Sequence, residues 1–276
     1  GVRMKFNPIR ENIAGKRLVV IDATGTRSMK PFEAQRIDPK LCLFEFVYFA
    51  RPDSRLYGQT VHTARQHMGE SLADQAPLPP DPAGREAMVM PVPESGIPAA
   101  EGYARRSGIP FGHGLVRNRY IGRTFIAPGQ DKRTQGVRMK FNPIRENIAG
   151  KRLVVIDDSI VRGTSTRAVV AMLREAGAAE VHLRISSPPY RWPCYFGMDT
   201  GTRGELIAAN LTVSEIRDYL GCDSLAYLEL DRLVTATGVA SRGFCTACLT
   251  GEYPLPVPWP RVDDELPEVD LVHPSG

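Results

Sequence analysis

Short apolar runs alternate along the chain with stretches in which apolar residues recur at helical spacing. Runs at 87–92, 152–156 and 180–185 predict three buried strands. After the second run, the apolar positions of 164–176 predict a helix, and Gly177 follows where a helix C-terminus commonly has glycine. Strands that alternate with helices favour a parallel sheet flanked by helices. We therefore expect an α/β fold.

Further helix starts are marked by polar residues. A turn at 93–96 precedes a helical stretch near 99–106. Two segments have the pattern of a capping box, in which a Thr hydroxyl and a Glu side chain satisfy the first amides of a helix. These boxes predict helices over 203–209 and 213–220, and they are Thr202-x-x-Glu205 and Thr212-x-x-Glu215.

Two stretches are typical of chain outside a packed core. Residues 74–84, DQAPLPPDPAG, are rich in proline and predict an exposed connection. Residues 254–276 combine prolines with acidic residues and lack periodic apolar positions, so we expect an extended or disordered tail.

The first 22 residues recur without a change at 136–157. The two copies diverge after the shared string VVID, where only the second continues into a second acid and a glycine-bearing loop. We interpret the first copy as a recombination or assembly artefact, with a recent duplication as the alternative, and assign it no site. Residues 23–253 then form the main domain.

Composition narrows the class of protein only a little. Of the 276 residues, 42% are hydrophobic and 24% charged, which is ordinary globular usage, and no apolar run approaches a membrane span. A net charge of +4 is too small to indicate nucleic acid or a membrane surface as a partner. Five cysteines, an odd and widely spaced set, do not suggest a secreted disulfide framework and favour the reducing cytoplasm.

The most informative segment is 153–166, LVVIDDSIVRGTST. An apolar strand ends in Asp157 and Asp158, and a loop with Gly163 then leads into a helix. Open α/β sheets bind ligands beyond the carboxyl ends of their strands, and a helix N-terminus attracts anions. The loop's hydroxyl residues would add donors around a phosphate: Ser159, Thr164, Ser165 and Thr166.

The paired acids would repel that phosphate unless they serve sugar hydroxyls or Mg²⁺. Simple helix capping is the alternative interpretation of two acids followed by Ser and Thr. The segment has neither the Gly-x4-Gly-Lys pattern nor the Gly-x-Gly-x-x-Gly turn of other nucleotide sites.

This segment resembles the phosphoribosyl pyrophosphate (PRPP) motif of type I phosphoribosyltransferases. The resemblance is closer still to the glutamine PRPP amidotransferase family, and it extends in collinear segments from about residue 23 to 253. These segments are LCLFEFVYFARPDS (41–54), PVPESGIPAAEGYA (91–104), LVRNRYIGRTFIAPGQ (115–130), VVIDDSIVRGT (154–164), VHLRISSPP (181–189), PCYFGMD (193–199) and CTACLTGEYP (245–254).

The resemblance implies roles for individual residues. Acids that match Asp157 and Asp158 hold the ribose hydroxyls and Mg²⁺ in that family, and the residue that matches Ser95 is a further Mg²⁺ ligand. The implied PRPP-binding set is Asp157, Asp158, Ser159, Arg162, Gly163, Thr164, Ser165 and Thr166.

Residues 119–147 are similar to the family's flexible lid, with Thr124 and Lys140 as candidate catalytic contacts. A solvated basic loop is the alternative. The implied reaction is displacement of pyrophosphate from PRPP by ammonia to give 5-phosphoribosylamine, the first step of de novo purine synthesis. Lys140 and Mg²⁺ would neutralise the leaving group, and a closed lid would exclude water.

By spacing alone, Cys245-x-x-Cys248 fits half a zinc site, a redox pair or two buried thiols. The resemblance implies that these two cysteines, with Cys42 and Cys194, ligate a [4Fe–4S] cluster. Such a cluster would join distant parts of the domain. Cys222 fits no such site and is expected to be an ordinary buried thiol.

The family's complete enzymes begin with a glutaminase domain whose first residue is a cysteine, whereas residue 1 here is Gly. We expect the chain as written to use free ammonia and not glutamine. The family also implies a homo-oligomer, which no residue here lets us derive. The rival functions are a PRPP-binding regulator without chemistry, an inactive fragment, and a salvage phosphoribosyltransferase that acts on a base.

Overall fold

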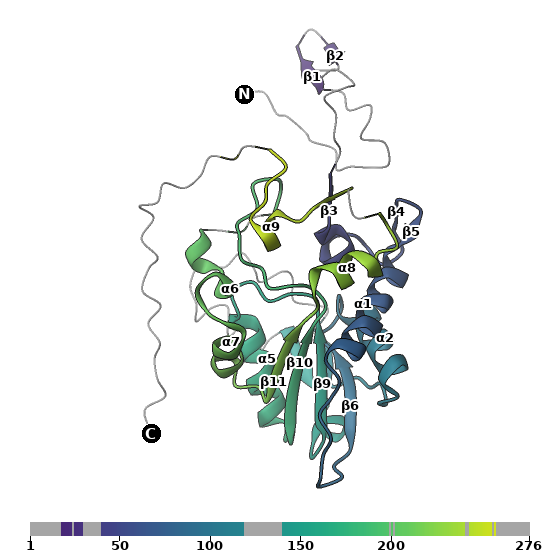
Figure 1. The fold of residues 1–276 in the computed structure, drawn as a ribbon, viewed down its shortest axis with the longest axis vertical. Helices are drawn as coiled ribbons and strands as arrows, with labels where there is room; N and C mark the ends of the chain where they lie inside the picture. Colours follow the sequence, from purple (N-terminus) through teal and green to yellow (C-terminus); the bar gives the residue numbers. More distant parts are fainter. Residues whose placement is uncertain are drawn as a thin grey trace.

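The computed structural model describes residues 18–23, 25–29, 40–118, 140–198, 200, 202–240, 243–255 and 257. Its centre is a four-stranded parallel sheet in the order β11-β10-β9-β6 (Figure 1). The strands are β6 (Ala87–Pro91), β9 (Arg152–Asp157), β10 (Glu180–Ile185) and β11 (Ser224–Tyr227). The expected parallel sheet is therefore confirmed, and the three apolar runs form its three neighbouring strands.

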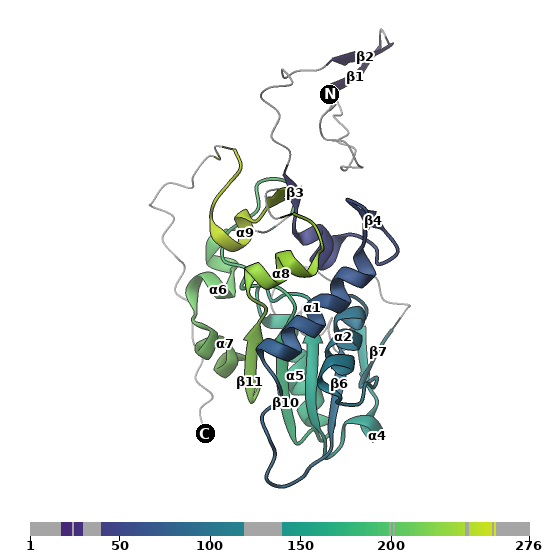
Figure 2. The same ribbon diagram turned by 45° about the vertical axis from the view of Figure 1, so that its right-hand side comes forward.

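Helices cover both faces of this sheet (Figure 2). Alternate residues of β9 serve the two faces: Leu153 and Val155 pack in one core, while Val154 and Ile156 pack in the other. The first core includes α5 (Thr164–Glu175) and α7 (Val213–Leu220), and the second includes α1 (Val61–Gln75) and α2 (Ile97–Ser107). Because both faces are buried, the strand is apolar at nearly every position.

A second group of short elements lies beyond the carboxyl ends of the sheet strands, above the sheet in Figure 1. Its core is a parallel pairing of β3 (Leu41–Cys42) with β12 (Phe244–Cys245). The other members are the π-helical turn η3 (Glu45–Phe49), the hairpin strands β4 (Arg55–Leu56) and β5 (Gln59–Thr60), α8 (Leu230–Ala236) and α9 (Ala247–Thr250).

The end of the predicted lid is regular structure, which corrects its boundary at 147. β7 (Leu115–Arg117) pairs antiparallel with β8 (Phe141–Pro143), and α4 (Arg145–Ile148) follows. Phe141 is buried in the core below α5, and this apolar contact explains why the chain is ordered there. Residues 119–139, the remainder of the predicted lid, lie outside the described residues.

One of the two predicted capping boxes is wrong. Thr212 and Glu215 form the reciprocal box that opens α7, but Thr202 makes no side-chain cap. Glu205 is instead held by Arg162, whose Nε donates to its carboxylate over 2.8 Å. With its Glu engaged elsewhere, the segment forms only a short 3₁₀ turn, η4 (Arg203–Glu205), followed by α6 (Ile207–Asn210).

The repeated string LVVID forms a strand in both places but with different partners. In the first copy it is β1 (Leu18–Asp22), which pairs antiparallel with β2 (Gly25–Met29) in a hairpin separate from the main sheet. In the second copy it is residues 153–157, the last five residues of β9. Asp22 therefore comes just before the turn of a hairpin, whereas Asp157 precedes a loop and a helix.

No helix in the described part of the chain combines the length and apolar character of a membrane span. Of the predicted tail, 254–276, only residues 254, 255 and 257 are described, and the rest lies outside the described residues.

Candidate functional site

The site is built around the acids at the carboxyl end of β9. Asp157 is the last residue of that strand and is half-buried, and Asp158 beside it is only 7% exposed. The backbone N–H of Asp158 donates to Oδ1 of Asp157 over 2.9 Å, which fixes the orientation of the Asp157 carboxylate. The predicted acid pair thus combines a buried carboxylate, Asp158, with a half-buried one, Asp157.

Burial raises the pKa of both carboxyl groups, because desolvation disfavours the charged form. The charge of Asp158 raises the pKa of Asp157 further. Hydrogen bonds from Ser159 and Ser95 act in the opposite direction on Asp158. Two buried acids this close are stabilised in the charged form when a cation lies between them.

Ser95 reaches the acids from the neighbouring strand. It lies in the turn that follows β6, and its Oγ donates to Oδ2 of Asp158 over 2.5 Å. The turn is held against β9 because the N–H of Val92 donates to the carbonyl of Ile156. Gly96 permits this approach, since a Cβ at that position would lie 2.6 Å from the Ile156 oxygen.

The loop after Asp158 leads directly into α5. Ser159 Oγ donates to Asp158 Oδ1 over 2.5 Å, and Gly163 has φ +78°, a left-handed conformation that favours glycine. No side chain caps the start of α5. Thr164 and Ser165 in its first turn are half-buried, and Thr166 is buried. The helix therefore presents uncapped amides and hydroxyls beside the acids, as an anion site requires.

The structure places two predicted site residues differently from the rest. Arg162 forms an ion pair with Glu205, so its guanidinium is directed toward η4. Lys140, just before β8, carries a positive charge that partly opposes the burial-driven rise in the pKa of Asp157. Thr124 lies outside the described residues.

The sequence analysis missed one buried cation, Arg65 in α1. It is 2% exposed, and its Nε and Nη2 donate to the carbonyls of Phe46 and Ala50 over 2.8 and 2.9 Å. Its positive charge partly opposes the burial-driven rise in the pKa of Asp158. The signal for it was its position on the apolar stripe of α1, four residues after Val61.

The four cysteines named as cluster ligands gather in the second group of elements. Cys42 and Cys245 are register partners in the β3–β12 pair, and Cys248 follows one turn later in α9. Electrostatic coupling joins Cys248 to each of the other three, Cys194 included. Cys222 is buried elsewhere, in the core beneath α7, as expected of an ordinary thiol.

Burial raises the pKa of Cys42 to about 12, and the pKa values of Cys245 and Cys248 are raised for the same reason. Within the described residues, no three His, Cys, Asp or Glu side chains converge closely enough to hold a single metal ion.

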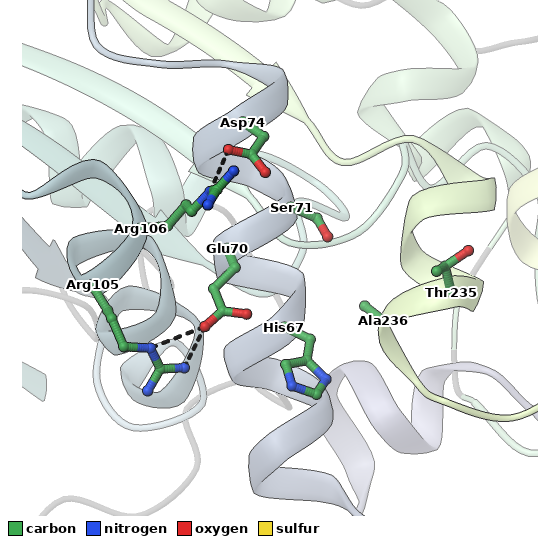
Figure 3. A pocket seen from close by; sticks show the side chains of 8 residues that line it. All are labelled: His67, Glu70, Ser71, Asp74, Arg105, Arg106, Thr235 and Ala236. Atoms are coloured by element: carbon green, nitrogen blue, oxygen red, sulfur yellow. Dashed lines mark hydrogen bonds and ion pairs between the residues drawn. The ribbon is translucent and has the colours of Figure 1, made fainter.

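A cavity of about 580 Å³ lies away from this site, between α1, α2 and α8 (Figure 3). Two ion pairs between α1 and α2 line it: Arg105 with Glu70 at 2.5 Å and Arg106 with Asp74 at 2.6 Å. None of the predicted site residues lines it. Its arginines already have carboxylate partners, so the acid and hydroxyl cluster at the end of β9 is the stronger candidate site.

Comparison with known proteins agrees with this geometry. Residues 72–186 match the family model of the phosphoribosyl transferase domain. An amidophosphoribosyltransferase of Synechococcus elongatus is 49% identical over 250 residues, covering 91% of this chain and 49% of its own length. One from Methanothermobacter thermautotrophicus is 52% identical over 217 residues, covering 79% of this chain and 44% of its own length.

A solved structure extends the comparison to the fold. The glutamine PRPP amidotransferase of B. subtilis complexed with ADP and GMP aligns with a TM-score of 0.71 and 45% identity, over 86% of this chain and 51% of that one. This chain spans about half the length of the curated relatives it matches. It has the type I phosphoribosyltransferase fold, and over most of its length it is similar to part of the amidophosphoribosyltransferases named above.

Proposed function

We propose that this chain transfers the phosphoribosyl group of PRPP to ammonia, giving 5-phosphoribosylamine and pyrophosphate, the first step of purine synthesis. One observation carries the proposal: the buried pair Asp157–Asp158 lies between the Ser95 hydroxyl and an uncapped helix N-terminus. Two relatives that are named amidophosphoribosyltransferase, and are 49% and 52% identical to this chain, support the proposal.

The 5′-phosphate would bind at the loop 159–166. Amides at the start of α5 and the hydroxyls of Thr164 and Ser165 are the donors that a phosphate dianion needs. The left-handed Gly163 lets the backbone turn closely around that group. Arg162 contributes to this site only if its ion pair with Glu205 opens.

Asp157 and Asp158 would hold the ribose hydroxyls and, together with Ser95, Mg²⁺. The donor set fits this ion, because carboxylate and hydroxyl oxygens are its preferred protein ligands. The pair is also buried at a point where a cation would offset its mutual repulsion. When bound, Mg²⁺ supplies positive charge that stabilises the pyrophosphate leaving group.

In the reaction, the bond from the anomeric carbon to the pyrophosphate oxygen breaks, and a carbon–nitrogen bond forms with ammonia. Pyrophosphate leaves with the electron pair, and the added nitrogen loses its surplus proton to solvent. Lys140, close enough to Asp157 to act on its charge, is the candidate to neutralise the departing group. Thr124 and the rest of the lid are proposed contacts that the described residues do not include.

For the four cysteines we propose a [4Fe–4S] cluster held by Cys42, Cys194, Cys245 and Cys248. Their convergence from β3, β12, α9 and the segment after β10 supports this assignment. Four thiolates are the ligands that such clusters take. The cluster would fasten residues near 42 to residues near 248, which is a structural role and not a redox one.

The remaining partners follow from the relatives. A glutaminase domain would supply ammonia in a longer protein, and the assembly would be a homo-oligomer in the cytoplasm. The similarity to an enzyme named for glutamine and PRPP supports the first of these.

The test is pyrophosphate release from PRPP and Mg²⁺ by the 276-residue chain, with an ammonium salt at raised pH or with glutamine as the nitrogen source. We expect turnover with ammonium, and the glutamine arm shows whether this chain can also draw its nitrogen from glutamine. The double variant Asp157→Asn/Asp158→Asn should abolish it, while Asp231→Asn, an exposed acid of α8, should not. Turnover that survives the double variant, or a folded chain inactive with ammonium, would contradict the proposal.

A further inference from the structure

Cys194 differs from the other three cluster cysteines in its local structure. Cys42, Cys245 and Cys248 lie in β3, β12 and α9, whereas the described residues between 186 and 202 contain no helix or strand. A ligand in such a segment has no backbone ladder to fix its direction. Its position must come from other contacts.

The strongest of these contacts is a threonine hydroxyl. The backbone N–H of Cys194 donates to Oγ1 of Thr200, six positions later in the chain, over 2.9 Å. The same oxygen accepts the hydroxyl of Tyr190 over 3.2 Å. Both lone pairs of the Thr200 oxygen are therefore used, one on the cysteine and one on a buried tyrosine.

Tyr190 connects this pair to the far side of the cluster site. Its side chain is fully buried, and its ring packs edge-on against Phe44 at a centroid distance of 5.5 Å and 88°. Phe44 stands two residues after Cys42. The hydroxyl chain from Cys194 through Thr200 to Tyr190 thus ends on the segment that carries another proposed ligand.

Backbone contacts hold the same segment against α9. The N–H groups of Arg191 and Trp192 both donate to the carbonyl of Cys248 over 3.0 Å. The Tyr253 hydroxyl donates to the carbonyl of Pro193 over 2.7 Å. These bonds hold the two segments together. Cys194 itself is held by the Thr200 side chain at its backbone N–H, and its Sγ accepts a longer bond, of 3.4 Å, from the N–H of Phe196.

We propose that Thr200, supported by Tyr190, is the positioning residue for Cys194, and that it holds this cysteine toward the other three before the cluster is assembled. The inference rests on the cluster proposed above. Groups outside the ligand set that orient a ligand commonly change metal affinity by about 10- to 100-fold when removed. Thr200→Val keeps the shape of the side chain and removes the acceptor.

The first measurement follows the cluster and not the activity. The full chain is reconstituted anaerobically with ferrous iron and sulfide, and iron release to an excess of chelator is followed by the loss of visible absorbance. We expect release about tenfold faster in Thr200→Val and about threefold faster in Tyr190→Phe. Thr200→Ser, which keeps the hydroxyl, and the control Thr202→Val should stay within about twofold of the parent. Thr202 is exposed and makes no cap hydrogen bond.

The second measurement needs no iron. Alkylation of the reduced, cluster-free chain by iodoacetamide is followed for each cysteine by mass spectrometry. Thr200→Val should raise the rate at Cys194 several-fold and leave the buried Cys222 unchanged, whereas general loss of structure would raise both.

Parental iron release and parental Cys194 alkylation in Thr200→Val would overturn the inference, and so would an equal effect of Thr202→Val. A parent chain that takes up no iron contradicts the proposed cluster instead. In that case the alkylation rates alone decide whether Thr200 orders Cys194.

Discussion

The hydroxyl of Ser95 donates to the Asp158 carboxylate over 2.5 Å, although the two residues are 63 positions apart in the chain. This bond joins the turn after the edge strand β6 to the end of its neighbour, β9. It brings one hydroxyl and two carboxylates together at the carboxyl ends of these two strands. The proposed Mg²⁺ and PRPP chemistry depends on that junction.

Removing the Ser95 hydroxyl should therefore weaken the use of PRPP without unfolding the chain. For Ser95→Ala we expect kcat/KM for PRPP to fall by about tenfold and the Mg²⁺ requirement to rise, because one oxygen donor is lost. Ser95→Thr retains the donor and should keep most of the activity. Pyrophosphate release at a series of Mg²⁺ concentrations measures both. An unchanged Mg²⁺ dependence in Ser95→Ala would exclude Ser95 from the ion's surroundings.

Gly96 should tolerate no side chain. A Cβ there would meet the Ile156 oxygen at 2.6 Å, so the turn that carries Ser95 has to move away from β9. We expect Gly96→Ala to lower the free energy of unfolding by ~1–3 kcal/mol, as overpacking does. Gly243→Ala is the matched control, because no atom lies within 4 Å of its Cβ. Urea unfolding measures the midpoint of each variant. Equal midpoints for Gly96→Ala and Gly243→Ala would contradict a close approach of position 96 to the Ile156 oxygen.

We expect that an apolar side chain of similar length cannot replace Arg65 without a loss of stability. Arg65→Met leaves the carbonyls of Phe46 and Ala50 without their donor and removes a positive charge that acts on Asp158. Loss of stability of about 2–4 kcal/mol follows from unpaired buried polar groups. Urea denaturation measures this loss, with Arg145→Met in the exposed turn of α4 as the control. Comparable midpoints for the two variants would contradict a buried role for Arg65.

Stability should fall as the pH is lowered because of His182. Burial lowers the pKa of this histidine, although Glu180 opposes the shift; Arg184 and Asp223 also act on it, and Ser224 bonds its Nδ1. The folded state thus stays neutral while the unfolded state takes up a proton below about pH 6.5, which favours unfolding. The free energy of unfolding should rise with pH through this range.

His182→Gln should flatten that dependence, and His67→Gln, an exposed histidine of α1, should leave it as it is. Urea midpoints between pH 5 and pH 8 test the assignment. An undiminished slope in His182→Gln would show that another group controls it.

The parts of the fold that could be predicted from sequence are those set by local pattern. The strand at 152–157 and its acid pair are visible because a fully buried strand is apolar throughout and ends where polar residues begin. Helix α1 was missed. Its buried Val61, Met68 and Leu72 are separated by His, Arg and Glu residues, and this weakens the periodic signal.

The residues of the candidate site divide in the same way, into those set by local sequence and those brought together by tertiary structure. The acids and hydroxyls of 157–166 are adjacent in sequence, so their grouping is local. The Arg162–Glu205 pair and the electrostatic effect of Arg65 on Asp158 join residues 43 and 93 positions apart, and no spacing rule specifies them. Ser95 and the four cysteines were assigned only through the family resemblance, because their grouping likewise depends on tertiary structure.

The central claim is that PRPP and a divalent cation bind at Asp157 and Asp158. Isothermal titration of the folded chain with PRPP in the presence of Mg²⁺ tests it most directly. We predict saturable binding that Asp157→Asn/Asp158→Asn weakens by more than about tenfold, as the loss of paired charged contacts should. No binding by the folded parent chain, or equal binding by the double variant, would contradict the account.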